Sequence, residues 1–306
     1  MAVVNSTTNL APEVQTYYEK VFLARGEYPF VLDQGAQKRT QAGGSGRSIN
    51  FTRRDNIVIN ADPLAEGTNP SASAIAASTV SVTLSEYGWA TSTSKLVSLV
   101  GIDQNMKETV EQVGQNMGET LNRVMRTELE NGTAYTPNAH TSANWAAGDV
   151  ISGSAIRAIV KELELKNAIA YSDGMFLGKT NPYSKYNLLG DTAWLNAKTY
   201  SDVKDLYKGE MGELYQVRFI LNKDVASQVG VASVAASAVT TYNTYVHGES
   251  AVGAFDLAGD KPKLYITQGI DSGNIAGRAA YVAWAGTYAA KILNSNWVYV
   301  AKFTAS

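Results

Sequence analysis

The strongest pattern along the chain is a helical one in its middle third. Apolar residues recur there at spacings of three, four and five positions: Met106, Val110, Val113, Met117, Leu121, Val124 and Leu129. This spacing predicts a long helix with Asp103 as its N-cap and Gly132 as its stop. At 1.5 Å per residue such a helix spans roughly 40 Å, a length typical of a structural spine. Gly114 and Gly118 inside it each cost about 1 kcal/mol, so we expect a neighbouring backbone to approach closely there.

Three further stretches show shorter helical patterns. One begins at Leu10-Ala11-Pro12 and runs to about Arg25, where Gly26 ends it. A second covers Ser154–Asn167. Its apolar face is formed by Ile156, Ile159, Val160 and Leu163. The third begins at Ser201 as its N-cap, and Gly209 lies just past its end, where a left-handed residue closes many helices.

Alternating apolar and polar residues predict strands before and after these helices. Ile49 and Phe51 alternate with polar neighbours, and so do Val80, Val82 and Leu84 after the turn-rich stretch DPLAEGTNPSAS. Together the two runs predict a long hairpin with a small, polar tip. The polar, glycine-rich residues that precede it, 34–47, indicate an extended arm without a core of its own.

Two strand patterns lie further along the chain. Residues 213–222 form a β-like run in which Tyr215, Val217, Phe219 and Leu221 face one way, after Gly212 in a turn. Near the end, Val282, Trp284, Tyr288 and Ile292 mark one strand, and Trp297, Tyr299 and Phe303 mark another. The turn residues 294–296 separate these last two runs, which predicts a closing antiparallel hairpin.

Composition indicates a folded, soluble protein. It also argues against tight binding to nucleic acid or membrane and against cysteine chemistry. The 306 residues are 45% hydrophobic, enough to bury a sizeable core in one large domain or two ordinary ones. Lys and Arg number 26 against 28 Asp and Glu, so the net charge of −2 gives no electrostatic reason for tight binding to nucleic acid or anionic membrane. The absence of cysteine excludes disulfides and thiolate metal sites and fits assembly in a reducing cytoplasm.

Neither the N-terminus nor the longest uncharged stretch indicates a membrane protein. The stretch MAVVNSTTNLAPEV lacks the basic start and apolar core of a signal peptide, so we expect a protein that is not exported. Residues 225–248 are long enough to cross a bilayer, but Ser, Thr, Gln and Asn are spread throughout them. That composition favours a region of loops and strands.

The stretch Gly174-Met175-Phe176-Leu177-Gly178-Lys179-Thr180 resembles a phosphate-binding loop but departs from it in two ways. Such a loop needs four residues between its glycines so that backbone N–H groups converge on the phosphates, and here there are three. A helix should begin at the Lys-Ser/Thr pair, whereas Asn181-Pro182 follows at once. We therefore expect Lys179 to be an ordinary surface charge.

Other candidate catalytic residues lack partners in the sequence. Glu210 and Glu213 could form an acid and base pair, but solvated or salt-bridged glutamates are the better interpretation. The only histidines, His140 and His247, accompany no nucleophile elbow or zinc motif, and we expect both to be exposed or at an interface. The basic pairs 38–39 and 53–54 fit solvated charges or subunit contacts. We assign no catalytic, cofactor-binding or metal-ligating residue.

Three local motifs, in this order, resemble those of a known family. A "GE-hydrophobic-G" turn before a β-run is present as Gly209–Gly212 followed by Val217-Arg218-Phe219. A "G-x-x-A-x-G" segment follows as Gly248–Gly253, and an "ILN-x-x-W" segment as Ile292–Trp297. Together with the arm, hairpin and spine helix, these motifs resemble tailed-phage major capsid proteins of the Hong Kong 97 fold, and within them the N-four-type major capsid family.

The resemblance implies a mixed α+β fold with five parts. These are an N-terminal arm at 1–45, an extended hairpin loop at 46–100, a peripheral domain with the spine helix at 101–170, an axial domain at 171–262, and a peripheral C-terminal β-hairpin at 263–306. It implies a structural protein without catalysis and without cofactors. We expect that the arm and the hairpin cannot bury their own apolar residues and therefore lie on neighbouring subunits, as the resemblance implies.

The resemblance also implies partners and a location. Hexamers and pentamers of one chain would close an icosahedral shell around the double-stranded DNA of a tailed phage, contacting the DNA only weakly and non-specifically. Scaffolding, portal and decoration proteins are further possible partners, and a membrane is not. The chain would be assembled in the host cytoplasm and reside in the virion capsid. Two alternatives stay open: the shell of a bacterial encapsulating nanocompartment, and a nucleotide-binding enzyme based on Gly174–Thr180.

Overall fold

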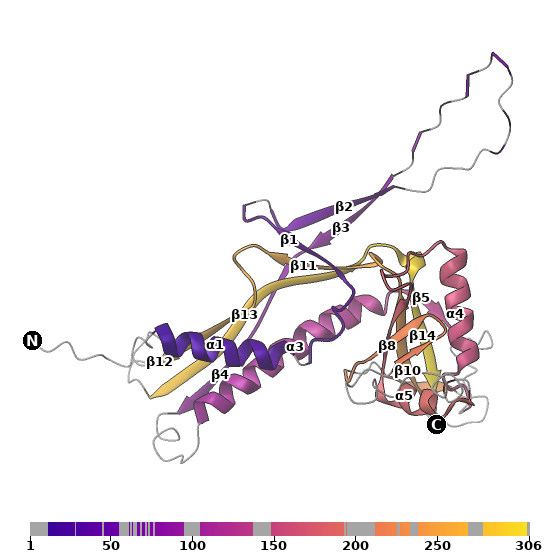
Figure 1. Cartoon of the computed structure of the whole chain (residues 1–306). Helices are drawn as coiled ribbons and strands as arrows, with labels where there is room; N and C mark the ends of the chain where they lie inside the picture. The colour runs from indigo at the N-terminus through magenta and orange to yellow at the C-terminus, as the bar shows by residue number, and fades with distance from the viewer. Residues whose placement is uncertain are drawn as a thin grey trace, which may run out of the picture.

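The computed structural model describes most of the chain. The described residues are 12–27, 29–44, 46–54, 61, 63, 66–67, 69–70, 72, 74–75, 77–94, 105–136, 148–192, 194, 212–224, 227–232, 238–268 and 278–304. They form two bodies, each built on one β-sheet, and a hairpin that projects away from both (Figure 1). Several predicted features lie outside the described residues: Asp103, His140, Glu210 and the helix from Ser201 to its stop at Gly209.

The first body packs two helices against a five-stranded sheet. Its helices are α1 (Pro12–Glu27) and α3 (Asn105–Leu129), and its strands are β1 (Gln37–Gln41), β4 (Ser85–Ser94), β11 (Val252–Leu257), β12 (Lys263–Gln268) and β13 (Ala279–Ile292). The long strand β13 is central, because β11 and β12 pair with one of its edges and β4 with the other. The first core lies between α3 and this sheet, where Trp284 and Val113 are buried.

The second body packs helices against a seven-stranded sheet. Its helices are α4 (Gly153–Leu165), α5 (Pro182–Gly190) and the short η3 (Ser295–Trp297). Its strands are β5 (Thr133–Tyr135), β6 (Phe176–Thr180), β7 (Gly212–Leu214), β8 (Val217–Leu221), β9 (Ser227–Ala232), β10 (Ala238–His247) and β14 (Val298–Thr304). The order is β5-β14-β10-β6-β8-β7, and β9 also pairs with β10. The apolar face predicted for α4 is buried in this second core.

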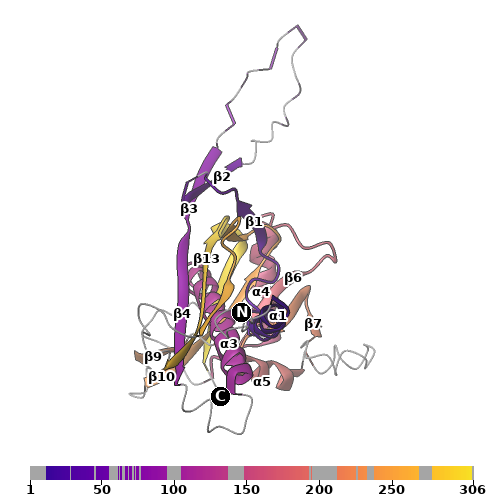
Figure 2. The same ribbon diagram turned by 90° about the vertical axis from the view of Figure 1, so that its left-hand side faces the viewer.

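The predicted hairpin is confirmed at its paired end. Strands β2 (Ser48–Arg54) and β3 (Ala77–Thr83) are antiparallel and form a two-stranded sheet that joins neither of the other two. Both views show it rising away from the bodies (Figure 2). Its base packs in a small core cluster in which Ile49 and Val82 meet Phe255.

The spine helix is confirmed, and its two glycines lie where α1 crosses it. A Cβ at Gly114 would lie 2.5 Å from the carbonyl oxygen of Phe22, and one at Gly118 would collide with the carbonyl oxygen of Gly26. The prediction that Gly26 ends the first helix is wrong, because α1 continues to Glu27. Gly26 is instead buried where α1 meets α3, so its missing side chain serves close packing.

Three predictions about extended segments need correction. The C-terminal runs form no hairpin: β13 belongs to the first sheet and β14 to the second, so η3 links the two bodies. The polar stretch 34–47 contains β1, which pairs in parallel with β11. The run 213–222 is two strands, because β7 and β8 form a hairpin whose turn residues Tyr215 and Gln216 have φ angles of 48° and 62°. Positive φ at both central residues is typical of a type I′ turn, which sequences usually mark with Asn or Gly.

Among the described residues, no helix is both long and apolar enough to span a membrane.

Candidate functional site

The two bodies meet at the short segment 29–36, which joins α1 to β1 and is here called the connector. The connector folds back on itself, since the Gln34 amide donates to the Val31 carbonyl (3.2 Å) and the Ala36 amide to the Asp33 carbonyl (3.0 Å). Leu32 is fully buried and Asp33 nearly so. A loop segment with this much buried backbone needs partners for its polar groups.

Three side chains from different elements supply those partners. Asn122 of α3 accepts from the amides of Val31 (3.2 Å) and Leu32 (2.9 Å) through its Oδ1. From β6, the Lys179 ammonium donates to the Leu32 carbonyl at 2.5 Å. The Tyr171 hydroxyl donates to the Gly35 carbonyl at 2.7 Å. One anchor comes from the first body and two from the second, so the connector fixes how the bodies meet.

The prediction that Lys179 is a surface charge is wrong. Lys179 lies in β6, a strand paired on both edges, and its side chain is 1% exposed. The stretch Gly174–Thr180 is therefore not a phosphate-binding loop, because Phe176–Thr180 is a buried strand and the Lys179 amine is bound to a backbone carbonyl. Truncation of Lys179 is accordingly a core substitution, and it leaves the Leu32 carbonyl without its donor.

Burial controls the ionisation of Lys179. Loss of hydration lowers the pKa of Lys179 to about 7, and the nearby Asp33 carboxylate only partly offsets this. Asp33 is itself paired with the exposed Lys38 at 2.6 Å. Lys179 therefore changes charge near neutral pH, which an exposed lysine does not do.

His247 lies beside this site and is fully buried, so the expectation that it is exposed or interfacial is wrong. Its Nδ1 is 3.1 Å from the Tyr171 hydroxyl. Burial, followed by the Lys179 charge, holds the pKa of His247 well below its ordinary value, so its ring is neutral. Burial also raises the pKa of Tyr171, which keeps the hydroxyl protonated as a donor.

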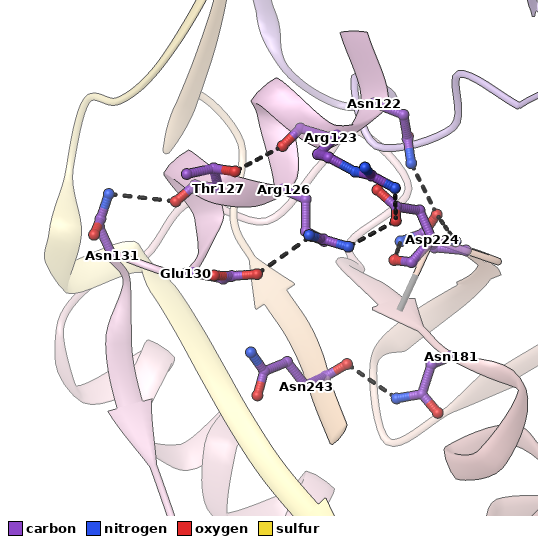
Figure 3. Close-up of polar contacts among 10 residues, drawn as sticks. Asn122, Arg123, Arg126, Thr127, Glu130, Asn131, Asn181, Asp224 and Asn243 are labelled. Carbon is purple, nitrogen blue, oxygen red and sulfur yellow. Dashed lines mark hydrogen bonds and ion pairs between the residues drawn. The ribbon is translucent and has the colours of Figure 1, made fainter. Parts of the chain in front are cut away.

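A second set of polar contacts joins the C-terminal half of α3 to the second body (Figure 3). Arg126 contacts Asp224 at 2.6 Å and Glu130 at 3.3 Å, and Arg123 reaches the same Asp224 oxygen at 3.6 Å. Both partners of the Arg126–Asp224 pair are largely buried, which favours a fixed geometry more than it adds stability.

Amide side chains extend this polar layer. Asn122 donates to Asn222 at 3.1 Å, and Asn181 of the second body donates to the Asn243 carbonyl at 3.0 Å (Figure 3). Burial raises the pKa of the neighbouring Tyr245, so its hydroxyl stays neutral. The contact between α3, the connector and the second sheet is thus both polar and apolar, because Tyr245 of β10 and Val298 and Val300 of β14 belong to the first core.

Sequence analysis missed these residues, although α3 carries a signal. Its positions 114, 118, 122, 126 and 130 form one row of residues four apart, occupied by Gly, Gly, Asn, Arg and Glu. The glycine half contacts α1, and the polar half contacts the connector and the second body. Nothing in the sequence marked Lys179 as buried or Tyr171 as an anchor of the connector.

The other candidate residues form ordinary surface contacts. Glu213 pairs with Arg218 at 3.0 Å, which confirms the salt-bridged interpretation for this glutamate. Of the basic residues, Lys38 pairs with Asp33, and Arg53 donates to Asn294 at 2.7 Å. In the part of the chain that the structure describes, no group of three His, Cys, Asp or Glu side chains could hold a metal ion.

An open pocket of about 710 Å³ lies between the start of α4 and α5. It is lined by Val150, Ile151, Ser152, Tyr186, Asn187, Leu189, Gly190 and Asp191. Asp191 is engaged there, because it accepts from the Gly153 amide at 2.6 Å at the start of α4. Ser152, also in the lining, caps the start of α4, because its hydroxyl oxygen accepts from the Ala155 amide at 3.4 Å.

Comparison with known proteins relates the chain to solved structures by its fold and not by its sequence. No protein-family model and no curated protein matches the sequence. Among solved structures, the capsid of Ralstonia phage GP4 matches with a TM-score of 0.69 at 14% identity, covering 100% of this chain and 96% of that one. The capsid asymmetric unit of cyanophage Pam1 matches with a TM-score of 0.61 at 13% identity, covering 100% and 98%.

A third match comes from a different source. A virus-like particle from Pyrococcus furiosus matches with a TM-score of 0.55 at 11% identity, covering 94% of this chain and 99% of that chain. Each match spans nearly the whole length of both proteins. The chain therefore has the mixed α+β, Hong Kong 97-like fold of phage capsid structures, as the sequence predicted.

Proposed function

We propose that this chain is the major capsid protein of a tailed phage and assembles through hexamers and pentamers into an icosahedral shell around double-stranded DNA. The observation that carries the proposal is the full-length match of the two bodies and hairpin to phage capsid structures. Low sequence identity is compatible with this role, because a shell subunit is defined by shape and contact surfaces rather than by a catalytic constellation.

Apolar side chains are buried unequally between the bodies and the hairpin, which supports assembly with neighbouring subunits. The two bodies bury large apolar cores, whereas β2 and β3 bury apolar side chains only at their base. A ribbon of two strands is marginally stable in water unless something covers one of its faces. Neighbouring subunits in a closed ring are the natural cover, since every copy then offers the same surface to the next.

The proposal assigns each part of the chain to a domain of the capsid subunit. Residues 1–45 serve as the arm, 46–100 as the extended loop, 101–170 with 263–306 as the peripheral part, and 171–262 as the axial part around the capsomer centre. Three strands and one helix cross this division: β5 and α4 lie within 101–170 but belong to the second body, β11 pairs in the first sheet, and β14 pairs in the second. The arm also contributes core residues through α1, where Phe22 is buried against α3.

We place the chain within the N-four-type capsid family on the three sequence motifs. Two of them have clear structural roles that support this placement. Ala251 and Val252 of the segment 248–253 are fully buried in the first core. In the segment 292–297, Asn294 caps η3 by accepting from the Asn296 amide at 3.2 Å, and thereby shapes the link between the two bodies.

The net charge of the chain determines the contact that we propose between the shell and its DNA. Contacts with packaged DNA are weak and non-specific, because the net charge is −2 and confinement rather than attraction holds the genome. Scaffolding, portal and decoration proteins complete the set, and the location is the capsid of the virion after assembly in the host cytoplasm.

Electron microscopy of the purified full-length chain tests the proposal. We expect closed particles of uniform diameter built of rings, at a protein concentration in the micromolar range. A chain that stays monomeric with or without co-expressed scaffolding protein would contradict the shell function.

The rival within this fold is the shell of a bacterial nanocompartment, and the match to a virus-like particle keeps it under test. The contents of particles made in the native host separate the two. Packaged double-stranded DNA supports the phage capsid, and a bound cargo enzyme without DNA supports the compartment.

A further inference from the structure

We propose that Lys179 makes the connector a pH-sensitive latch: the connector stays docked on the second sheet at neutral to alkaline pH, and acidification favours its release. The latch acts within one subunit and does not depend on the proposed shell function. It is defined by the connector (residues 29–36), by its anchors Asn122, Lys179 and Tyr171, and by the buried groups around Lys179.

Geometry sets the first requirement, which is that opening the connector must hydrate Lys179. The Leu32 carbonyl accepts from the Lys179 amine at 2.5 Å, and both residues are essentially inaccessible to solvent. The other edges of the site are paired strands, because Lys179 lies opposite Tyr245 in β10 and Ile220 in β8. The connector is a single loop segment, so its removal is the least disruptive way for water to reach the amine.

The second requirement is that Lys179 is the group that titrates. Asp33 faces it from the connector, and Lys38 of β1 neutralises that carboxylate from outside. His247 and Tyr245 face it from β10. Burial keeps His247 neutral by lowering its pKa and keeps Tyr245 neutral by raising its pKa.

Two tyrosines near the site also stay uncharged at neutral pH. The Tyr171 hydroxyl stays protonated because burial, followed by Glu249 and Asp173, raises its pKa. Tyr288, which faces Asp33, also stays protonated because burial raises its pKa. Lys179 is the group at this site whose pKa lies near 7.

The sign of the effect follows from proton linkage. The docked state holds Lys179 with a pKa of about 7, whereas an undocked, hydrated lysine regains its ordinary value of 10.5. Between these values the open state binds one more proton, so the opening equilibrium falls about tenfold for each pH unit of increase. Below pH 7 both states are protonated, and the opening equilibrium is at its largest and independent of pH.

Amide hydrogen exchange of the full-length chain, kept in one assembly state at every pH, measures this opening. The reporters are the Leu32 amide, bound to Asn122, and the Ala36 amide, bound to the Asp33 carbonyl. After correction for intrinsic exchange, we expect their protection to be nearly constant from pH 5.5 to 6.5 and to rise about 15-fold between pH 7 and 8.5.

Two variants and one internal control make the result decisive. Lys179→Met removes the titrating amine at similar length, and we expect the rise in protection to disappear. Lys161→Met on α4, where the lysine is 64% exposed, should keep the wild-type rise. Amides of β14 such as Val300 should show no rise, because the event is local.

The latch is overturned by any of three results. These are Leu32 protection that does not change with pH in the wild type, a rise that persists in Lys179→Met, or an equal rise in β14. If Lys179→Met does not fold, the wild-type titration with its β14 control decides alone.

Discussion

The body around α3 and the β2–β3 hairpin bury very different shares of their apolar side chains within one chain. Along α3, residues Val110, Val113, Met125 and Leu129 are fully buried in the first core. Along β3, most positions are exposed, and burial is confined to the base of the hairpin. The difference teaches that the bodies carry most of the buried apolar surface of the described residues, whereas under the proposed shell function the hairpin is covered by neighbouring subunits. The predictions below test this contrast.

The largest loss of stability is expected from Trp284→Ala in the first core. Trp284 is 1% exposed, packs in the core against α3 and donates to Asn116 at 2.9 Å. Its truncation should lower the free energy of unfolding by about 3–5 kcal/mol, measured by denaturant titration. Trp89 is the matched control, because it lies directly opposite Trp284 in the sheet yet is 48% exposed. An equal loss from Trp89→Ala would contradict the division into core and surface.

A smaller loss is expected where α1 crosses the spine. Gly118→Val places a side chain against the Gly26 backbone, and overpacking of this kind costs about 1–3 kcal/mol. Gly190→Ala at the end of α5 is the control, since no atom lies within 4 Å of the added Cβ. Thermal unfolding should separate the two variants, and equal melting temperatures would show that the helices do not touch at Gly118.

Phe51→Ala tests the base of the hairpin. The Phe51 ring lies 4.8 Å from the Phe255 ring and 4.9 Å from the Arg39 guanidinium, but it is only half-buried. We expect a loss of about 1 kcal/mol in the isolated subunit and a larger proportional loss of particle yield. Thr52→Ala on the exposed side of the same strand should leave unfolding unchanged. A loss as large as that from Trp284→Ala would show that the hairpin belongs to the main core.

Sequence patterns predicted the elements whose determinants are local. The apolar periodicity of α3 and α4, and the alternation in β2 and β3, reflect one buried face each, so each could be recognised from a short window. The fold class itself came from the order of these elements and three motifs. Boundaries given by a single glycine were less reliable, because Gly26 serves packing rather than helix termination.

Long-range pairing and burial could not be predicted in the same way. Strands β13 and β14 are adjacent in sequence, yet their partners lie in different sheets, a choice set by the whole topology. Tyr215 and Gln216 form their turn without the usual Asn or Gly. Lys179 and His247 have polar side chains that sequence reading places at the surface, and only the folded chain shows that β6 and β10 bury them.

Shortening the hairpin tests the central claim most directly. Residues 55–76 would be replaced by Asn-Gly, which closes the paired ends Arg54 and Ala77 with a two-residue turn. Unfolding and particle formation of this variant would be compared with those of the full chain by denaturant titration and electron microscopy. We expect the free energy of unfolding to change by less than about 1 kcal/mol while closed shells are lost. Normal closed shells from the shortened chain would contradict the claim that the hairpin is completed by neighbouring subunits.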